Sequence, residues 1–301
     1  MLLMTTSLLL RSPSSNERAS VKREVAIVLG CDRVGSAIAY ALHRAGLAVV
    51  LIDGVDPPWC RRGMSYTDAW YLGSAELGGE GACFCASLKS IPSVLSRRLI
   101  AATTWSWSGV AAELDALAVI DARLCRHPPI APIRGRVQHA VGVGEGLVPG
   151  VDVDVVIERA LADHNLATPA SRIPPSIPAG FARLTPAMGT VVARSLEADR
   201  DGRFVTHHRI ADVVRVGEVV GHLNRQPMVA PCAGVLCGLS ARGARIVRGQ
   251  TIVEVDPRGD PALCFGLGDE PLQIAHRVLA ALAMRGLVTA GQAVPEPAAY
   301  C

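Results

Sequence analysis

The chain has 301 residues, long enough for two or three domains; half of them are hydrophobic and 19% are charged. That balance supplies a sizeable core and excludes a chain that is disordered throughout. Basic and acidic residues are interspersed, with a net charge of only +3, which gives no footprint for nucleic acid. No apolar run approaches the roughly 18 residues of a membrane span, so we expect no membrane partner.

Nine cysteines are scattered along the chain, and no pair has the two-residue gap of a zinc knuckle. We therefore expect no metal site, and we interpret most of the cysteines as buried, reduced thiols of a cytoplasmic protein.

Residues 24–54 carry the pattern around which the rest of the chain is organised. Val25–Leu29 and Ala48–Ile52 are short apolar runs, typical of strands buried on both faces of a parallel sheet. Between them, Gly30 and Gly35 mark a turn, and apolar residues at three- and four-residue spacing predict a helix. Asp53 follows the second strand. This order predicts the βαβ unit of a Rossmann-like dinucleotide fold.

The turn in this unit is a candidate anion site, formed by Gly30, Asp32, Arg33 and Gly35 together with Asp53. The amino end of the helix directs backbone amides at a phosphate, and an acid about twenty residues further on accepts hydrogen bonds from a ribose diol. The usual fingerprint has a third glycine where Asp32 stands, and a carboxylate there repels a pyrophosphate. Arg33 would offset this with a positive charge. The alternative is a domain that has lost its nucleotide or binds a different anionic group.

A proline-stiffened loop leaves the second strand and carries Arg61 and Arg62, at the edge where open α/β sheets bind ligands. Two adjacent guanidinium groups there can hold a phosphate through charge-assisted hydrogen bonds. The alternative interpretation is a solvated basic loop.

A second candidate ligand loop follows a predicted strand that runs into Gly144 and Gly146. Glycines at such a point let the backbone approach a ligand closely. Asp152, Asp154 and Glu158 follow and are candidates for a metal or acid/base cluster, with Asp152 as part of the ligand site. The alternative is that these acids face solvent or cap a helix that starts just after them.

An internal repeat occupies residues 198–258. Gly202 and Gly234 are 32 residues apart, and so are Gly217 and Gly249. The repeat resembles the biotinyl/lipoyl hybrid barrel, in which two such halves interlock. The lysine which that family modifies lies in the hairpin between the halves, but residues 223–229 contain none, so we expect no biotin or lipoate. We interpret this barrel as a pseudo-symmetric packing or docking module.

The sequence therefore predicts an α/β protein with five segments. These are a disordered tail at 1–23, a Rossmann-like domain at 24–125, a glycine-loop segment with a proline-rich linker at 126–197, the barrel at 198–258, and a C-terminal helix and tail at 259–301. Leu272–Met284 is the amphipathic helix, which we expect to cap the core.

Together these features resemble a known family. The Rossmann-like start, Arg61-Arg62, the stretch VGVGEGLVPGVDVDVVIE, the lysine-free barrel, VDPRGD and Cys264-Phe265 are similar to the accessory proteins of selenium-dependent molybdenum hydroxylases, relatives of xanthine dehydrogenase. The resemblance covers roughly residues 24–284. It implies a role in maturing a molybdenum hydroxylase, by handling its cofactor or a labile selenium or sulfur ligand, and it assigns no reaction or catalytic residue. The family usually has glycine and then aspartate where Asp32 and Arg33 stand.

Two functions from different classes follow. The first is a maturation factor that binds a phosphate-bearing small molecule, such as a nucleotide or a molybdopterin-type cofactor, and docks a molybdenum hydroxylase through its barrel. The second is an NAD(P)-dependent oxidoreductase of a small molecule. Asp32 weighs against the second, because it occupies the pyrophosphate loop.

Overall fold

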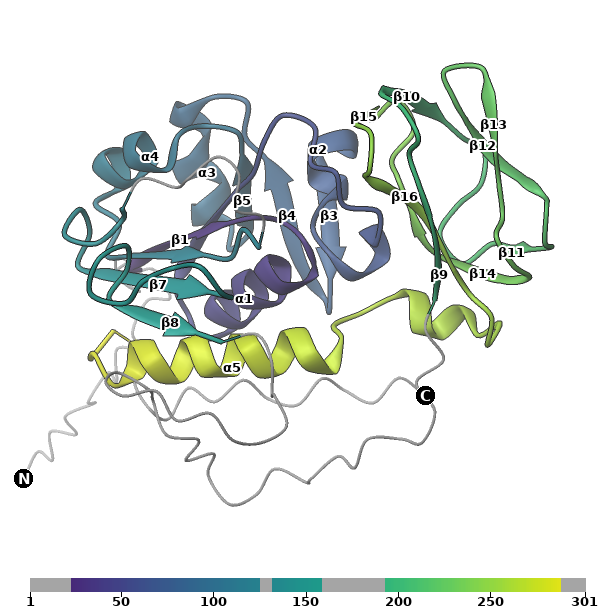
Figure 1. Ribbon diagram of the computed structural model, residues 1–301. Coiled ribbons are helices and arrows are strands. Elements are labelled where there is room, and N and C mark those ends of the chain that lie inside the picture. The colour runs from purple at the N-terminus through teal and green to yellow at the C-terminus, as the bar shows by residue number, and fades with distance from the viewer. Residues whose placement is uncertain (1–22, 125–131, 159–192, 288–301) are drawn as a thin grey trace, which may run out of the picture.

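The computed structural model describes residues 23–124, 132–158 and 193–287, which form an α/β unit and a smaller β module (Figure 1). The tail expected at 1–23 lies outside the described residues except for its last residue, and the proline-rich linker lies outside them as well. The α/β unit is a mostly parallel sheet covered by helices on both faces, and the β module contains only antiparallel strand pairs.

An eight-stranded sheet with the order β3-β4-β5-β2-β1-β6-β7-β8 forms the centre of the α/β unit. All neighbouring strands run parallel except the β3–β4 hairpin. The strands are β1 Val25–Leu29, β2 Ala48–Ile52, β3 Ser74–Leu77, β4 Glu80–Phe84, β5 Ile100–Thr103, β6 Ala118–Asp121, β7 His139–Val143 and β8 Val155–Ile157. Because β2 and β6 flank β1, the strand order changes direction there, and open α/β sheets bind ligands at the carboxyl ends of strands at such a point.

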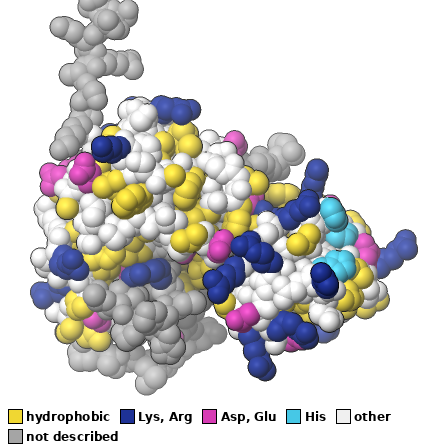
Figure 2. All heavy atoms as spheres, turned by 90° about the horizontal axis from the view of Figure 1, so that it is seen from above, with side chains coloured by type: hydrophobic (Ala, Val, Ile, Leu, Met, Phe, Trp, Pro, Cys, Tyr) yellow, Lys and Arg dark blue, Asp and Glu magenta, His cyan; other side chains and the backbone are white. Residues whose placement is uncertain are grey.

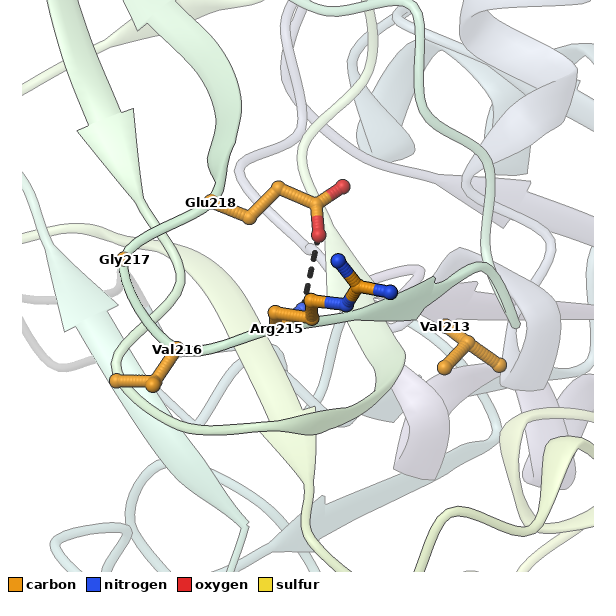
Figure 3. A pocket seen from close by; sticks show the side chains of 5 residues that line it. All are labelled: Val213, Arg215, Val216, Gly217 and Glu218. Atoms are coloured by element: carbon orange, nitrogen blue, oxygen red, sulfur yellow. Dashed lines mark hydrogen bonds between the residues drawn. The ribbon is translucent and has the colours of Figure 1, made fainter.

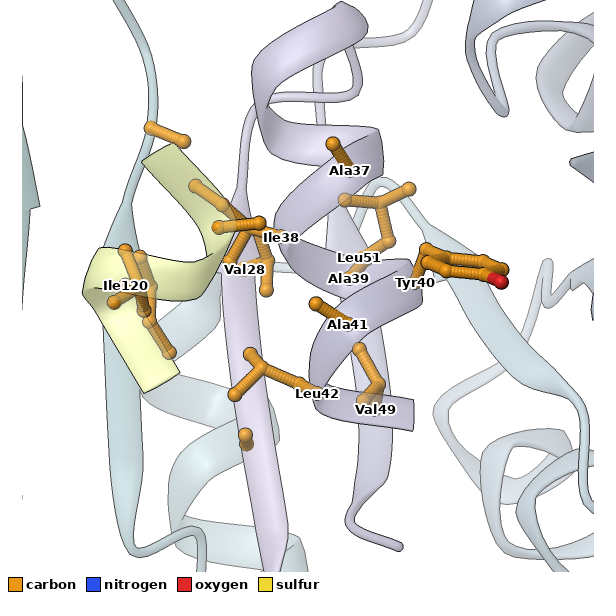
Figure 4. Close-up of a cluster of buried hydrophobic side chains, with 14 of the residues drawn as sticks. Val28, Ala37, Ile38, Ala39, Tyr40, Ala41, Leu42, Val49, Leu51 and Ile120 are labelled. Atoms are coloured by element: carbon orange, nitrogen blue, oxygen red, sulfur yellow. The ribbon is translucent and has the colours of Figure 1, made fainter. Parts of the chain in front are cut away.

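The side chains of β1 divide between two hydrophobic cores, because successive residues of a strand point to opposite faces. Ala26 and Val28 pack with α1 and α5, whereas Ile27 and Leu29 pack with α3 and α4. Figure 4 shows the first of these cores around α1. The helices are α1 Arg33–Arg44, α2 Asp68–Leu72, α3 Ile91–Ser96, α4 Trp107–Leu114 and α5 Asp269–Ala283. Of the helices in the described ranges, none is both long and apolar enough to cross a membrane.

The C-terminal helix α5 returns from the β module and lies along α1 (Figure 1). Its residues Ile274, Val278 and Leu282 are buried in the same core as β1 and α1. The expected capping helix is therefore part of the α/β unit. Strands β7 and β8, which the sequence places in a separate segment, likewise extend the parallel sheet.

The β module consists of two four-stranded sheets with the orders β13-β12-β10-β15 and β11-β14-β16-β9. A 3₁₀ turn, η3 at Pro261–Cys264, connects the module to α5. The strands are β9 Arg194–Glu197, β10 Gly202–Val205, β11 Val213–Val214, β12 Val219–Leu223, β13 Gln226–Val229, β14 Gly234–Leu239, β15 Arg245–Ile246 and β16 Thr251–Asp256.

The 32-residue repeat extends over every strand of the module. Strands β9 to β12 correspond to β13 to β16, 32 residues further along the chain. Each strand and its counterpart belong to different sheets, so a shift of 32 residues relates one sheet to the other. The loop hydrogen bonds repeat as well, since Gly217 N donates to Ala230 O at 2.9 Å and Gly249 N donates to Ala198 O at 2.8 Å. Each sheet thus contains strands from both halves, so neither half can complete a sheet alone.

Candidate functional site

The carboxyl edge of the parallel sheet holds both predicted glycine loops, which follow β1 and β7 on either side of β6. In the ladder β1-β6-β7, Leu29 pairs with Asp121 and Asp121 pairs with Gly142. Gly30 and Gly144 come shortly after two of these residues and therefore lie at the same edge. Gly30 packs closely against the residues that follow β6. A Cβ atom on Gly30 would lie 3.2 Å from the carbonyl oxygen of Ala122.

The loop between β1 and α1 requires glycine at both ends. Gly30 has a φ of +97°, which favours glycine. A Cβ atom on Gly35 would lie only 1.8 Å from the carbonyl oxygen of Gly30. The backbone therefore folds tightly on itself before the helix begins.

Asp32 caps the helix that a ligand phosphate would otherwise approach. It is the N-cap of α1, and its Oδ1 atom accepts a hydrogen bond from Gly35 N at 2.8 Å. A carboxylate of the chain itself thus occupies the anion position at the amino end of the helix. Arg33 is half-buried in the next position, and none of the described carboxylates forms an ion pair with it.

Asp53 is also engaged by groups of the chain. Its Oδ2 atom accepts hydrogen bonds from Cys31 N at 2.7 Å and from Trp59 Nε1 at 3.0 Å. Its Oδ1 atom accepts a third from Gly54 N at 2.7 Å. A ribose diol would need these same oxygens. In the observed conformation, Asp53 joins the glycine loop to the loop that follows β2.

Cys31 lies within this loop, and its buried thiol is held in the protonated form. The thiol is fully buried, and its Sγ atom lies 3.7 Å from Thr67 Oγ1. Burial, reinforced by Asp53, raises the pKa of Cys31 well above its ordinary value, so the thiol is protonated at neutral pH. Its carbonyl oxygen accepts hydrogen bonds from Ser36 Oγ at 2.9 Å and from Thr67 Oγ1 at 3.2 Å.

Arg61 and Arg62 are directed toward the β module. Arg61 forms an ion pair with Glu254 of β16. Arg62 forms an ion pair with Asp68 and donates from Nε to the carbonyl oxygen of Leu239 at 2.8 Å. Both guanidinium groups are partly buried. They join the two parts of the molecule, and this placement differs from the solvated loop of the alternative interpretation.

Asp152 lies away from the two glycine loops. It shortly precedes β8, which is parallel to β7, and so it lies toward the amino edge of the sheet. Its Oδ2 atom accepts from Val148 N at 2.8 Å, which closes a turn. Asp154 accepts from Ala140 N at 2.9 Å. The helix considered after these acids is instead strand β8.

Within the described part of the chain, no group of three or more His, Cys, Asp or Glu side chains is arranged to hold a metal ion. An open hollow lies on the β module, lined by the turn residues Val213, Arg215, Val216, Gly217 and Glu218 (Figure 3). Glu218 Oε2 accepts from Arg215 N at 2.9 Å, which holds this turn. The hollow contains none of the predicted site residues.

Two residues at the carboxyl edge had no signal in the sequence that identified them. Trp59 reaches Asp53 only because its loop folds back. Arg123 follows the buried Asp121 and pairs with it through Nε at 3.0 Å and Nη2 at 2.9 Å.

The fold and this edge define an α/β protein with an appended β module and a glycine loop capped by its own aspartate. No protein-family model matches the chain. The chain is similar to the uncharacterized protein YqeB of Escherichia coli (strain K12), at 24% identity over 273 residues. The matched part is 87% of this chain and 48% of YqeB, so the chain spans about half the length of that relative.

Proposed function

We propose that this protein is an accessory protein that matures a molybdenum hydroxylase of the xanthine dehydrogenase type. The resemblance of its motifs to the accessory family supports this role. The strand order around β1 supports a Rossmann-like α/β unit, and the exchange of sheets between the two halves supports a biotinyl/lipoyl-like barrel. A cytoplasmic location is part of the same proposal.

The ligand that we propose is a phosphate-bearing small molecule, either a nucleotide or a molybdopterin-type cofactor. The observation that carries this proposal is that the Gly30 and Gly144 loops share the carboxyl edge, with Arg33, which pairs with none of the described carboxylates, at the start of α1. Gly144 and Gly146 both have positive φ angles, +92° and +85°, so their loop is a backbone surface that a ligand can approach closely. Asp32 confines the phosphate to the side of Arg33 and this second loop.

The geometry does not favour the alternative of an NAD(P)-dependent oxidoreductase. Asp32 takes the amide that a pyrophosphate would use, and Cys31 and Trp59 take the oxygen of Asp53 that a ribose would use. Both polar contacts of a dinucleotide would therefore have to displace contacts within the chain.

Titration of the purified protein with NAD tests this part of the proposal. If the pocket has the shape of a dinucleotide site, Asp32→Gly should strengthen NAD binding about tenfold, because it removes a repelling carboxylate and frees the helix amide. Asp56→Gly, which removes an exposed acid of the following loop, is the matched control and should change nothing. If Asp32→Gly gives no gain, the pocket is not shaped for a dinucleotide; tight binding and turnover of NAD by the unaltered protein would contradict the proposal.

A deletion strain tests the maturation role. The hydroxylase should accumulate as folded but inactive protein without this chain, and the reintroduced gene should restore its activity. Normal hydroxylase activity in the deletion strain would overturn the proposed function.

The hairpin between the two halves of the barrel turns at Asn224 and Arg225. The absence of biotin or lipoate stays a prediction, and the mass of the intact protein tests it.

A further inference from the structure

The pseudo-symmetry of the β module creates two equivalent outer faces, of which the chain itself covers one. On the sheet β11-β14-β16-β9, the outward residues Val235 and Cys237 are fully buried and pack with Cys264 of η3. Glu254 of the same face pairs with Arg61 of the α/β unit. The main chain takes part as well, since Leu239 N donates to Cys60 O at 2.8 Å.

The equivalent face on the sheet β13-β12-β10-β15 is exposed. The residues 32 positions before Val235, Cys237 and Glu254 are Arg203, Val205 and His222. All three are exposed, while Phe204 and Leu223 beside them point into the core. We call this surface the exposed face; it consists of Arg203, Val205, Val219, His222, Val229 and Arg245.

The exposed face is basic and carries an electrostatic cost of its own. Arg203 and Arg245 are direct cross-strand partners, and like charges in that position destabilise a sheet. Neither forms an ion pair with a carboxylate in the described ranges. Arg225 and Arg242 lie in turns that adjoin these strands. Figure 2 shows many Lys/Arg and some His side chains over the β module, with fewer Asp/Glu and with hydrophobic side chains among them.

The face also contains apolar surface that would gain from burial. Val219 and Val229 are cross-strand partners, and 44% and 42% of their surfaces are exposed. Val205, 38% exposed, is the cross-strand partner of His222. Apolar centres with charged surroundings are typical of protein interfaces, and arginine is enriched in them.

These observations select one kind of occupant. A second copy seated face to face would bring one basic face against another, which opposes such a dimer. A nucleic acid would leave the paired valines without apolar partners. The covered face, by contrast, already binds protein through apolar packing and one ion pair. An acidic protein surface with apolar side chains complements the exposed face in both respects.

We propose that the exposed face is the docking site for the hydroxylase, through an acidic and partly apolar surface of that enzyme. This inference rests on the proposed function and adds the place and chemistry of the contact. The pseudo-symmetric module would then act as an adaptor, with one face bound to its own α/β unit and the other to the client.

Binding of the full chain to the hydroxylase purified from the same organism tests the inference, by biolayer interferometry at several salt concentrations. Arg203→Glu/Arg245→Glu should weaken binding at least about tenfold, and salt should weaken binding of the unaltered protein. Arg97→Glu/Arg194→Glu makes the same change of charge at exposed positions outside the face and should bind normally. Val219→Ser should weaken binding without changing its salt dependence. Thermal unfolding confirms that each variant is folded.

The outcomes separate the two proposals. If the unaltered protein binds the hydroxylase and Arg203→Glu/Arg245→Glu binds equally well, the docking site is wrong and the maturation role stands. If the unaltered protein does not bind the hydroxylase at all, both fail. A 20-base-pair DNA duplex is the second probe, and tighter binding of DNA than of hydroxylase, lost in the same double variant, would overturn protein docking in favour of nucleic acid.

Discussion

The two outer faces of the β module have the same backbone arrangement but different chemistry. Where the exposed face has Arg203 and Val205, the covered face has Val235 and Cys237, both without solvent exposure. His222 corresponds to Glu254, the partner of Arg61. The interior of the module is alike in both halves, because Phe204 and Leu236 are both fully buried. The repeat therefore specifies the backbone of the module and its interior, while the neighbour of each sheet determines which side chains suit its outer face.

Exchange of one equivalent pair of residues should give the largest effect. Val235→Arg would place an unpaired charge in the contact with η3, and we expect a loss of about 3 kcal/mol or more in the free energy of unfolding. The reciprocal change Arg203→Val should stay within about 0.5 kcal/mol and should be slightly stabilising, because it removes a like-charge contact. Urea unfolding measures both. Equal effects of the two changes would show that the faces do not differ as described.

The ion pair across the covered face should give an intermediate effect. Glu254→Gln removes the carboxylate partner of Arg61, and both side chains are about three-quarters buried. We expect a loss of about 1–2 kcal/mol, between the values typical of exposed and buried pairs. His222→Gln alters the equivalent position on the exposed face and serves as the control. If His222→Gln lowered the free energy of unfolding as much as Glu254→Gln does, the stabilising role of the ion pair would be contradicted.

The smallest effect should appear in acid. The hydrogen bond from Arg258 holds the pKa of Asp256 below its ordinary value. The unfolded chain therefore binds this proton at a higher pH than the folded protein does. The stabilisation is complete above the ordinary pKa, about 4, and is lost as the pH falls through the lower folded value.

Asp256→Asn should therefore reduce the slope of stability against pH below about pH 4. It also makes the two halves alike, because Asn224 occupies the equivalent position on the exposed side. Thermal unfolding between pH 2 and 5, with buffer series at constant ionic strength, measures the slope. An unchanged slope would mean that other carboxylates dominate the acid response.

The sequence alone was sufficient for much of the local structure. The strands predicted at Val25–Leu29 and Ala48–Ile52 are present with those bounds, because continuous apolar runs have few options other than a buried sheet. The 32-residue spacing of glycines corresponds to the spacing of the strands throughout the β module. The helix predicted at Leu272–Met284 is present as Asp269–Ala283, since its apolar spacing marks one face.

The candidate site was less accessible from sequence, because its properties depend on contacts between distant residues. The sequence placed Asp32, Asp53 and Gly144 at the carboxyl edge through the rules of parallel sheets. It did not show that Trp59 would donate a hydrogen bond to Asp53, or that Arg61 would pair with Glu254, 193 residues further along the chain. An arginine is suited equally to a phosphate and to a glutamate, and only the packing of the two parts of the molecule selects between them.

The sequence by itself determined which segments form strands and helices, which side chains are apolar, and where the repeat begins again. Those properties follow from local periodicity and from the conformational needs of glycine. Only the tertiary structure decided which face of the β module is covered, which acids cap loops of the chain itself, and which cations of the described residues form ion pairs. The reason is that burial and ion pairing depend on the neighbours that folding brings to each side chain, and local sequence does not contain them.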